Sequence, residues 1–220
     1  MTSAGELPRL HIVTDDAILI RPDVLDVARD VFERAGPRLA FHLRGHATAG
    51  GRLYALGSAL ARVATSTGSW LFVNDRIDVA LAADAAGVQL GRRSIPMPRV
   101  RTLIGARRIG YSAHSADEAS TAERDGTDFV VLGTIYPTAS HPSAEPAGPG
   151  LVREATSRVG VPVIAIGGVT PDRAAELVAA GAHGVAAITG VWNAGDIGGR
   201  IDEYLAALAS TQDEEMKNAE

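Results

Sequence analysis

Short apolar runs and longer amphipathic stretches alternate along the whole chain. Runs such as Val163 to Ile166 are rich in Val and Ile, which is typical of strands buried on both faces. Between the runs, apolar residues recur at helical spacing, as they do from Val24 to Phe32. The pattern predicts strands over residues 10–14, 39–44, 70–73, 87–91, 108–111, 128–133, 163–166 and 184–190. It predicts helices over residues 24–35, 53–65, 75–85, 98–104, 115–124, 151–159 and 197–208, and one more that begins at Pro171.

The strand–helix unit recurs at a spacing of roughly 25 residues, as a βα repeat requires. Eight such units in a row predict an α/β protein, a single-domain (β/α)8 TIM barrel over residues 8–209. Residues 1–7 and 210–220 lie outside the repeat, and we expect them to be flexible termini. In such barrels the chemistry lies at the carboxyl ends of the strands, so the residues at those ends are the candidates for a site.

The second predicted strand alternates in a way that assigns its side chains to two faces. Phe41 and Leu43 belong to the face toward the helices, and His42 and Arg44 then point into the barrel. An arginine there can clamp a carboxylate or phosphate, although it can also form a buried ion pair. An inward histidine can exchange protons near neutral pH, or it can be a hydrogen-bonded core residue.

Glycines follow the last two predicted strands. Gly167-Gly168 precede Thr170-Pro171, which suit the N-cap and first position of a helix, and Ile188, Thr189 and Gly190 stand at the end of the final strand. Turns without side chains bring backbone N–H groups close to a ligand, and this end of a barrel is the usual phosphate site. We expect phosphate binding at Gly167, Gly168, Ile188 and Thr189; the alternative is that the glycines only make tight turns.

Polar residues end three other strands. Asn74 and Asp75 follow the third strand, and Asp75 is either a helix N-cap or a metal or substrate ligand. Ser112 and His114 end the fifth strand, where His114 beside a capping box at Ser115 can instead satisfy local backbone groups. Thr134 ends the sixth strand and is a poor base near neutrality. We expect Asn74, Ser112 and Thr134 to contact the substrate.

One long irregular segment, residues 138–150, follows the sixth strand on the same face of the barrel. Loops of this length are often lids or binding loops, and the alternative is an insertion tolerated at the surface. Thr138 and Ser140 are candidate substrate ligands within it, and His141 is a candidate catalytic residue.

Composition narrows the class of protein. With 46% hydrophobic residues the chain can bury a large core, and without cysteine it has no disulfide or thiolate chemistry. A net charge of −5 argues against nucleic acid as a partner. We see no signal peptide and no apolar run long enough to cross a membrane, and expect a cytoplasmic protein. The sequence leaves open whether the chain forms a homo-oligomer.

Taken in order and spacing, these stretches resemble the thiamine phosphate synthase superfamily, which contains the synthases and the TenI-type thiazole tautomerases. The resemblance runs from about Leu10 to Trp192 and implies a small phosphorylated thiazole as ligand, with its phosphate at the glycine turns. It rests on residues 42–44, 73–76, 87–91, 110–115, 136–138, 165–168 and 187–190.

Departures from the family pattern bear on the reaction. By resemblance, Asp75 corresponds to a magnesium ligand of the synthases, but the position of a second ligand is Ser94, so we expect weak metal binding. His46 and His141 stand where synthases carry lysines. Loss of this machinery favours the tautomerase branch, yet the histidine that this branch shows after the sixth strand is Thr134 here.

The sequence therefore favours a TenI-like thiazole tautomerase, an isomerase that aromatises the thiazole ring by moving a proton and needs no cofactor. Its catalytic candidates are His42, Arg44, His114 and His141. One alternative is a thiamine phosphate synthase, which joins hydroxymethylpyrimidine pyrophosphate to thiazole phosphate and uses Mg²⁺. The other is a barrel that binds a phosphorylated ligand without catalysis.

Overall fold

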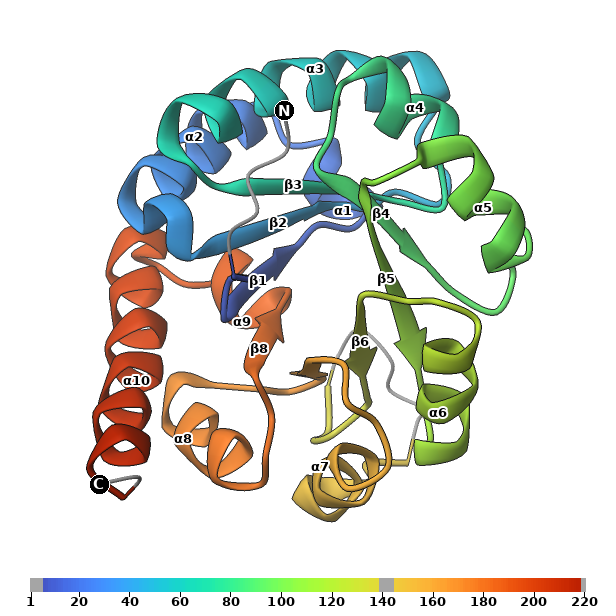
Figure 1. Ribbon diagram of the computed structural model, residues 1–220. Helices are drawn as coiled ribbons and strands as arrows, with labels where there is room; N and C mark the ends of the chain where they lie inside the picture. The colour runs from blue at the N-terminus through green and yellow to red at the C-terminus, as the bar shows by residue number, and fades with distance from the viewer. Residues whose placement is uncertain (1–5, 139–144, 219–220) are drawn as a thin grey trace.

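Eight parallel strands form a closed barrel in the computed structural model, which describes residues 6–138 and 145–218. Each strand pairs with the next in sequence, and the first pairs with the last, so the predicted (β/α)8 barrel is confirmed. Helices surround the strands (Figure 1). The strands are β1 (Leu10–Val13), β2 (Leu39–Leu43), β3 (Trp70–Asn74), β4 (Gly87–Leu90), β5 (Arg108–Ala113), β6 (Phe129–Leu132), β7 (Val163–Ile166) and β8 (Gly184–Ala187).

The helices of the described residues follow the strands in turn. A four-residue helix stands beside the barrel after β1 and another after β8. A single 3₁₀ turn, Gly36–Arg38, leads into β2. The α-helices are α1 (Asp16–Leu19), α2 (Val24–Ala35), α3 (Gly50–Thr67), α4 (Ile77–Ala82), α5 (Met97–Ile104), α6 (Ala116–Arg124), α7 (Gly148–Thr156), α8 (Pro171–Ala179), α9 (Thr189–Trp192) and α10 (Ile197–Asn218).

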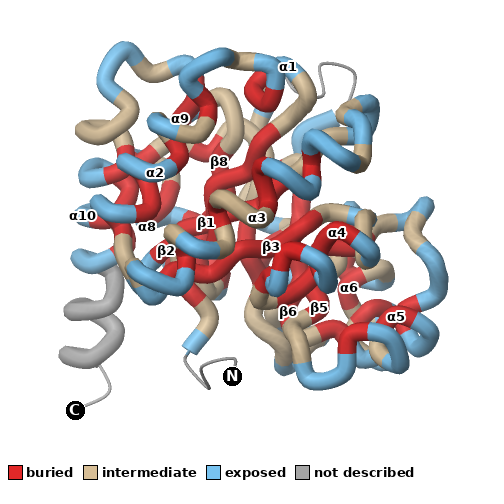
Figure 2. Tube along the Cα trace, turned by 90° about the horizontal axis from the view of Figure 1, so that it is seen from above, coloured by how far each residue is buried: buried red, intermediate tan, exposed pale blue. Residues whose placement is uncertain are grey.

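The strands bury side chains on both faces, which explains their uninterrupted apolar sequences. On β2, Phe41 and Leu43 pack toward the helices, whereas Ala40 packs inside the barrel with Phe72 and Phe129. The alternation predicted for this strand is therefore confirmed. Figure 2 shows the buried strands at the centre of the molecule, with exposed residues along the outer helices.

Several predicted helix boundaries are wrong: α3 begins three residues before the predicted start, and α7 covers Gly148–Thr156 rather than residues 151–159. The helix predicted from residue 75 begins at Ile77 as α4, and its N-cap is Arg76. Asp75 has a φ of +60°, unlike the extended backbone typical of an N-cap, so of the two roles predicted for Asp75 the N-cap is wrong. The last helix is predicted to end at Leu208, but α10 continues to Asn218. The added residues include Gln, Glu, Met and Lys, which favour helix even without an apolar repeat.

The two ends of the barrel sequence meet at its base. Arg9 donates through Nε to the carbonyl oxygen of His183 at 2.8 Å and through Nη1 to that of Leu208 at 3.2 Å. Helix α10 packs against both α2 and α8, and so covers the seam between β1 and β8 (Figure 1). Among residues 6–138 and 145–218, no helix is long and apolar enough to cross a membrane.

Candidate functional site

A cavity of about 740 Å³ opens at the carboxyl ends of the strands. Loops after the strands meet at this end of a β/α barrel, so groups distant in sequence can act on one ligand there. Of the residues expected in the site, Ser140 and His141 lie outside the described part of the chain. The cavity is lined by the others: His42, Arg44, Asn74, Asp75, Ser112, His114, Thr134, Thr138, Gly167, Gly168, Ile188 and Thr189.

The glycine turn after β7 and the start of α9 form one side of the cavity. Gly167 and Gly168 have φ angles of +103° and +60°, which residues with a Cβ rarely adopt. A Cβ on Gly168 would also lie 2.3 Å from the carbonyl oxygen of Pro137. The backbone N–H groups of Gly168 and Thr189 donate to no acceptor in the part of the chain that the structure describes. Unpaired N–H groups beside a cavity suit an anion.

Arg173 adds a positive charge at this side, and the sequence analysis missed it. Its Nη1 donates to the carbonyl oxygen of Gly168 at 2.7 Å, and its guanidinium lies 4.3 Å from the centre of the Tyr136 ring. The Tyr136 hydroxyl donates to Glu176 at 2.6 Å; burial, followed by this hydrogen bond, raises the pKa of Tyr136 to about 12. The sequence offered one signal for this residue, its position: Arg173 lies in the first turn of a helix that begins at the cavity.

Three arginines line the cavity across the barrel from the glycine turn. Arg44 follows β2, and Arg92 and Arg93 follow β4. Arg92 Nε lies 3.7 Å from Glu118 Oε1, whereas the Arg44 guanidinium pairs with no carboxylate among the described residues. The buried ion pair that was the alternative for Arg44 is thus not observed there. A guanidinium at this position can bind a carboxylate or phosphate in two parallel hydrogen bonds.

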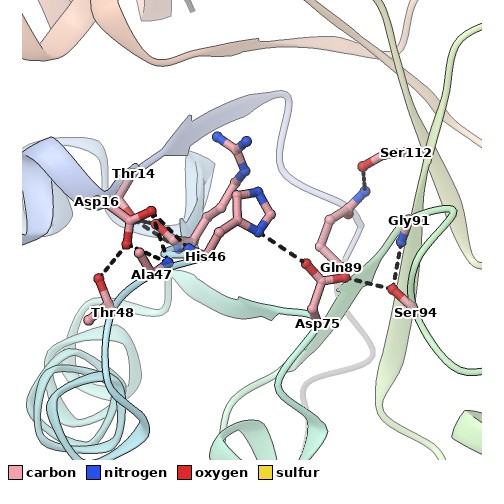
Figure 3. Close-up of polar contacts among 11 residues, drawn as sticks. Thr14, Asp16, His46, Ala47, Thr48, Asp75, Gln89, Gly91, Ser94 and Ser112 are labelled. Atoms are coloured by element: carbon pink, nitrogen blue, oxygen red, sulfur yellow. Dashed lines mark hydrogen bonds and ion pairs between the residues drawn. The ribbon is translucent and has the colours of Figure 1, made fainter.

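Asp75 lies between Ser94 and His46 at the same edge (Figure 3). Ser94 Oγ donates to Asp75 Oδ1 at 2.6 Å and accepts a hydrogen bond from the Gly91 N–H at 2.9 Å. His46 Nδ1 is 3.9 Å from Asp75 Oδ2. The Asp75 side chain therefore faces the two loops on either side of it rather than the start of α4.

These residues provide an incomplete site for magnesium. Mg²⁺ takes six oxygen ligands and is usually held by one or two carboxylates together with substrate phosphates. Within residues 6–138 and 145–218, no three His, Asp, Glu or Cys side chains gather closely enough to hold a metal ion. Asp75 offers a single carboxylate, one oxygen of which already accepts the Ser94 hydroxyl. The donor set fits an ion only when a substrate's phosphates supply further ligands.

A second aspartate fixes the loop that carries His46. Asp16, in α1, accepts hydrogen bonds from Thr48 Oγ1 at 2.6 Å and from the backbone N–H groups of His46 and Ala47 at 3.0 Å each (Figure 3). The Thr48 bond, and the backbone bonds after it, hold the pKa of Asp16 below its ordinary value. The loop after β2 is therefore pinned to α1, which places His46 at the rim beside Asp75.

His42 lies at the floor of the cavity and is bonded to a second histidine. Its Nε2 is 2.8 Å from Nδ1 of His11, on β1, and its ring stacks on Phe72 with the ring centres 5.0 Å apart. His42 is 2% exposed; burial lowers its pKa to about 3, and the neighbouring Asn74 side chain offsets only part of this effect. A histidine that stays neutral does not suit the proton shuttle expected of His42, but it suits a hydrogen-bonding role.

Two buried amide oxygens in the same cavity are unpaired. Gln89, on β4, donates from Nε2 to Ser112 Oγ at 2.9 Å, which leaves the Ser112 hydroxyl hydrogen available to a ligand (Figure 3). Gln89 Oε1 and Asn74 Oδ1 accept no hydrogen bond from the described residues. Because an unpaired buried acceptor is costly, these atoms indicate where the polar groups of a ligand belong. Gln89 was not among the predicted site residues.

His114 and Thr134 lie on the β5–β6 side of the cavity. His114 Nδ1 is 2.6 Å from the carbonyl oxygen of Gly133, so Nδ1 carries the proton and Nε2 is left as an acceptor. The predicted capping box is present in modified form: the Glu118 N–H donates to Ser115 Oγ, while Glu118 Oε2 accepts from the backbone N–H of His114. His114 is therefore held by Gly133, which follows β6, and by Glu118 of α6, and it still lines the cavity.

The fold and the site together define a class: a β/α barrel whose mouth joins a glycine turn with unpaired N–H groups among the described residues to a cluster of arginines around a polar floor. A family model described as thiamine monophosphate synthase matches residues 10–191. The chain belongs to this family, the thiamine phosphate synthase and TenI superfamily, and the resemblance drawn from the sequence is confirmed.

Relatives agree with this assignment. The thiamine-phosphate synthase of Moorella thermoacetica is 39% identical over 165 residues, which cover 74% of this chain and 79% of the relative. That of Methanospirillum hungatei is 36% identical over 191 residues, covering 86% and 91%. The solved structure of thiamine phosphate pyrophosphorylase from Pyrococcus furiosus superimposes with a TM-score of 0.82 at 30% identity, covering 92% of this chain and 96% of that one.

Proposed function

We propose that the protein is a transferase that joins a pyrimidine pyrophosphate to a thiazole phosphate, with release of pyrophosphate. The observation that carries this proposal is the cavity itself, which joins the glycine turn at one end and the arginines at the other in one space of about 740 Å³. Cavities of 300–1,000 Å³ hold drug-sized ligands, so two small substrates can lie side by side in it. The names of the relatives support the same reaction. This reverses the preference drawn from the sequence, where the tautomerase came first.

Each end of the cavity takes one substrate in this proposal. The N–H groups of Gly168 and Thr189, with Arg173, hold the thiazole phosphate. Arg44 and Arg93 hold the pyrophosphate of the other substrate, because guanidinium groups match phosphate oxygens in geometry and charge. The floor holds the pyrimidine ring between them.

Positioning and charge are what the chain itself contributes to the reaction. Two reactants fixed in one orientation react as a single molecule would, and preorganised cations stabilise charge that grows on a leaving group. A magnesium ion held by Asp75 and the pyrophosphate would neutralise further negative charge on that group. The arginines stabilise the same negative charge. Because Asp75 offers the ion a single carboxylate, the arginines supply most of this stabilisation.

A thiazole tautomerase is the second candidate, and the contact between Ser94 and Asp75 favours it, since the hydroxyl stands where a metal ligand would strengthen the synthase proposal. In that case Arg44 clamps the ring carboxylate, and His114 Nε2 is the acceptor placed to move the proton. His42 is unsuited to that step because burial lowers its pKa to about 3.

Two assays on the same purified protein separate the candidates. The first measures pyrophosphate release from hydroxymethylpyrimidine pyrophosphate with thiazole phosphate and Mg²⁺. The second uses NMR to measure proton exchange at the ring carbon of thiazole carboxylate phosphate. We expect pyrophosphate release, reduced on the order of 10²-fold in Arg44→Gln and unchanged in Arg99→Gln, an exposed arginine of α5 outside the cavity. Proton exchange without pyrophosphate release would reject the transferase and select the tautomerase.

A further inference from the structure

Tyr204 lies on α10, outside the barrel, yet its hydroxyl reaches the turn that follows β7. Helix α10 packs against α8 and α9 at the outer edge of the molecule (Figure 1). The Tyr204 side chain is fully buried, and its hydroxyl donates to the carbonyl oxygen of Val169 at 2.7 Å. Burial raises the pKa of Tyr204 to about 12, so the hydroxyl keeps its proton at neutral pH and remains a donor. A buried hydrogen bond therefore joins α10 to the glycine turn of the cavity.

This hydrogen bond determines the direction of a neighbouring N–H group. In a trans peptide, the C=O of one residue and the N–H of the next point in opposite directions. Val169 and Thr170 line the cavity, whereas Tyr204 does not. The Val169 carbonyl, held by Tyr204, therefore points away from the cavity, and the N–H of Thr170 points toward it. That N–H donates to no acceptor among residues 6–138 and 145–218.

The preceding carbonyl group is held in the same way by a side chain of α8. Arg173 Nη1 donates to the carbonyl oxygen of Gly168 at 2.7 Å, which fixes the peptide group between Gly168 and Val169. The N–H of Val169, like that of Thr170, has no acceptor in the described part of the chain. Two successive peptide groups are thus fixed through their carbonyl oxygens, and their N–H groups are left for a ligand. Successive N–H groups of this kind bind anions.

The turn after β8 packs against the same hydrogen bond. A Cβ on Gly190 would lie 2.9 Å from the Tyr204 hydroxyl oxygen and 3.2 Å from the carbonyl oxygen of Val169. Gly190 directly follows Thr189, whose N–H also lacks an acceptor among the described residues. The Tyr204 hydroxyl therefore lies against both turns that border this side of the cavity, although Tyr204 itself is not part of the cavity wall.

We propose that Tyr204 is a positioning residue for the phosphate of the thiazole substrate: its hydroxyl holds the Val169 carbonyl away from the cavity, so that the N–H groups of the glycine turn face the ligand. This role rests on the proposed function, which places the thiazole phosphate at this turn. Without the hydroxyl, the Val169 carbonyl would be buried without a partner, and rotation of its peptide group would relieve that cost. The same rotation would carry the Thr170 N–H away from the phosphate.

The test replaces Tyr204 by phenylalanine, which removes only the hydroxyl and keeps the ring. Isothermal titration calorimetry of the full chain with thiazole phosphate should show about tenfold weaker binding by Tyr204→Phe than by the wild type, because one N–H donor to a charged group is misplaced. Binding of pyrophosphate with Mg²⁺, which the proposed function assigns to the arginines across the cavity, should be unchanged. A general loss of structure would weaken both ligands, so the difference between them isolates the positioning role.

Thr127→Val is the matched control. Thr127 is buried before β6, and its Oγ1 is 2.9 Å from the carbonyl oxygens of both Ile109 and Phe129, away from the cavity. The valine variant also loses a buried hydroxyl that bonds a backbone carbonyl, and it should keep the wild-type affinity for thiazole phosphate. Equal affinities of Tyr204→Phe and the wild type would overturn the proposal. So would an equal loss for both ligands, or the same loss in Thr127→Val.

Hydrogen exchange of the wild type decides the matter if Tyr204→Phe fails to fold. Coupling between two sites is reciprocal, so thiazole phosphate should slow exchange at the backbone N–H groups of residues 200–208 in α10, and pyrophosphate should not. Absence of this protection would refute the role of Tyr204. A wild type that does not bind thiazole phosphate would refute the proposed function and this role together. The expected pattern in a protein that releases no pyrophosphate would refute the proposed function alone.

Discussion

Ser94 donates a 2.6 Å hydrogen bond to Asp75, joining the loop after β4 to the loop after β3. The hydroxyl accepts from the Gly91 N–H at the same time, so Ser94 is fixed from both sides. A neutral donor therefore stands against the Asp75 carboxylate. The edge of the cavity nearest Asp75 depends on arginines for positive charge.

Replacing Ser94 by aspartate should create the second ligand. We expect Ser94→Asp to bind Mg²⁺ at least tenfold more tightly than the wild type in the presence of pyrophosphate, because two carboxylates then face one ion. Isothermal titration calorimetry measures the difference. Ser94→Asn matches the size without the charge and should stay at the wild-type affinity. Equal affinities for the aspartate and asparagine variants would show that the carboxylates do not converge.

Gly168 should not tolerate a side chain. Gly168→Ala places a methyl group 2.3 Å from the Pro137 carbonyl oxygen and strains a φ of +60°. We expect thiazole phosphate to bind at least tenfold more weakly, since a shift of this turn moves its N–H group. Gly126→Ala is the control, with a φ of +97° but open space around the added carbon. It should lose about 1 kcal/mol of stability and keep ligand affinity; similar losses of affinity in both variants would contradict the assignment.

Acid should destabilise the fold through the buried histidine pair. The pKa of His42 is lowered to about 3 in the folded protein, from an ordinary value near 6.5. Below pH 6.5 the unfolded chain therefore binds a proton that the folded chain refuses, so stability falls as pH decreases toward 3 and is unaffected above 6.5. At pH 5 this costs about 2 kcal/mol for His42. Urea unfolding at pH 7 and 5 should give a smaller difference for His42→Gln; an equal difference would contradict the buried neutral state.

Asp16 should stabilise the loop after β2. Asp16→Ala removes the acceptor for Thr48, His46 and Ala47, and we expect a loss of about 1 kcal/mol together with faster hydrogen exchange at the backbone N–H groups of His46 and Ala47. Urea unfolding and exchange mass spectrometry measure the two effects. Asp26→Ala, which removes only an exposed pair with Arg29, should change neither. Unchanged exchange in Asp16→Ala would show that the loop is held otherwise.

Predictions from the sequence were correct where a local pattern of residues determines the structure. The alternation along β2 assigned Phe41 and Leu43 to one face and His42 to the other, because a strand offers only two faces. The glycine turn at Gly167 and Gly168 was predictable for the same reason, since positive φ angles select glycine locally.

Such predictions failed where the answer depends on contacts between distant segments. The pairing of His11 with His42 follows from the register of β1 against β2, in which Val13 stands opposite His42, and no local pattern encodes that register. Of the two roles predicted for Asp75, the sequence alone could not reject the helix N-cap, because an acidic residue before a helix resembles one. The contact of Asp75 with Ser94, nineteen residues later, is encoded by no local pattern.

The closure of the barrel also constrains how the protein is made. Residues 10–12 of β1 pair with residues 185–187 of β8, so the first strand has no second neighbour until nearly the whole chain has left the ribosome. Its free edge is an open hydrogen-bonding template throughout synthesis, exposed to other nascent chains. Final closure also awaits α10, which covers the seam. Truncation near the carboxyl terminus should therefore damage solubility before it damages any residue of the cavity.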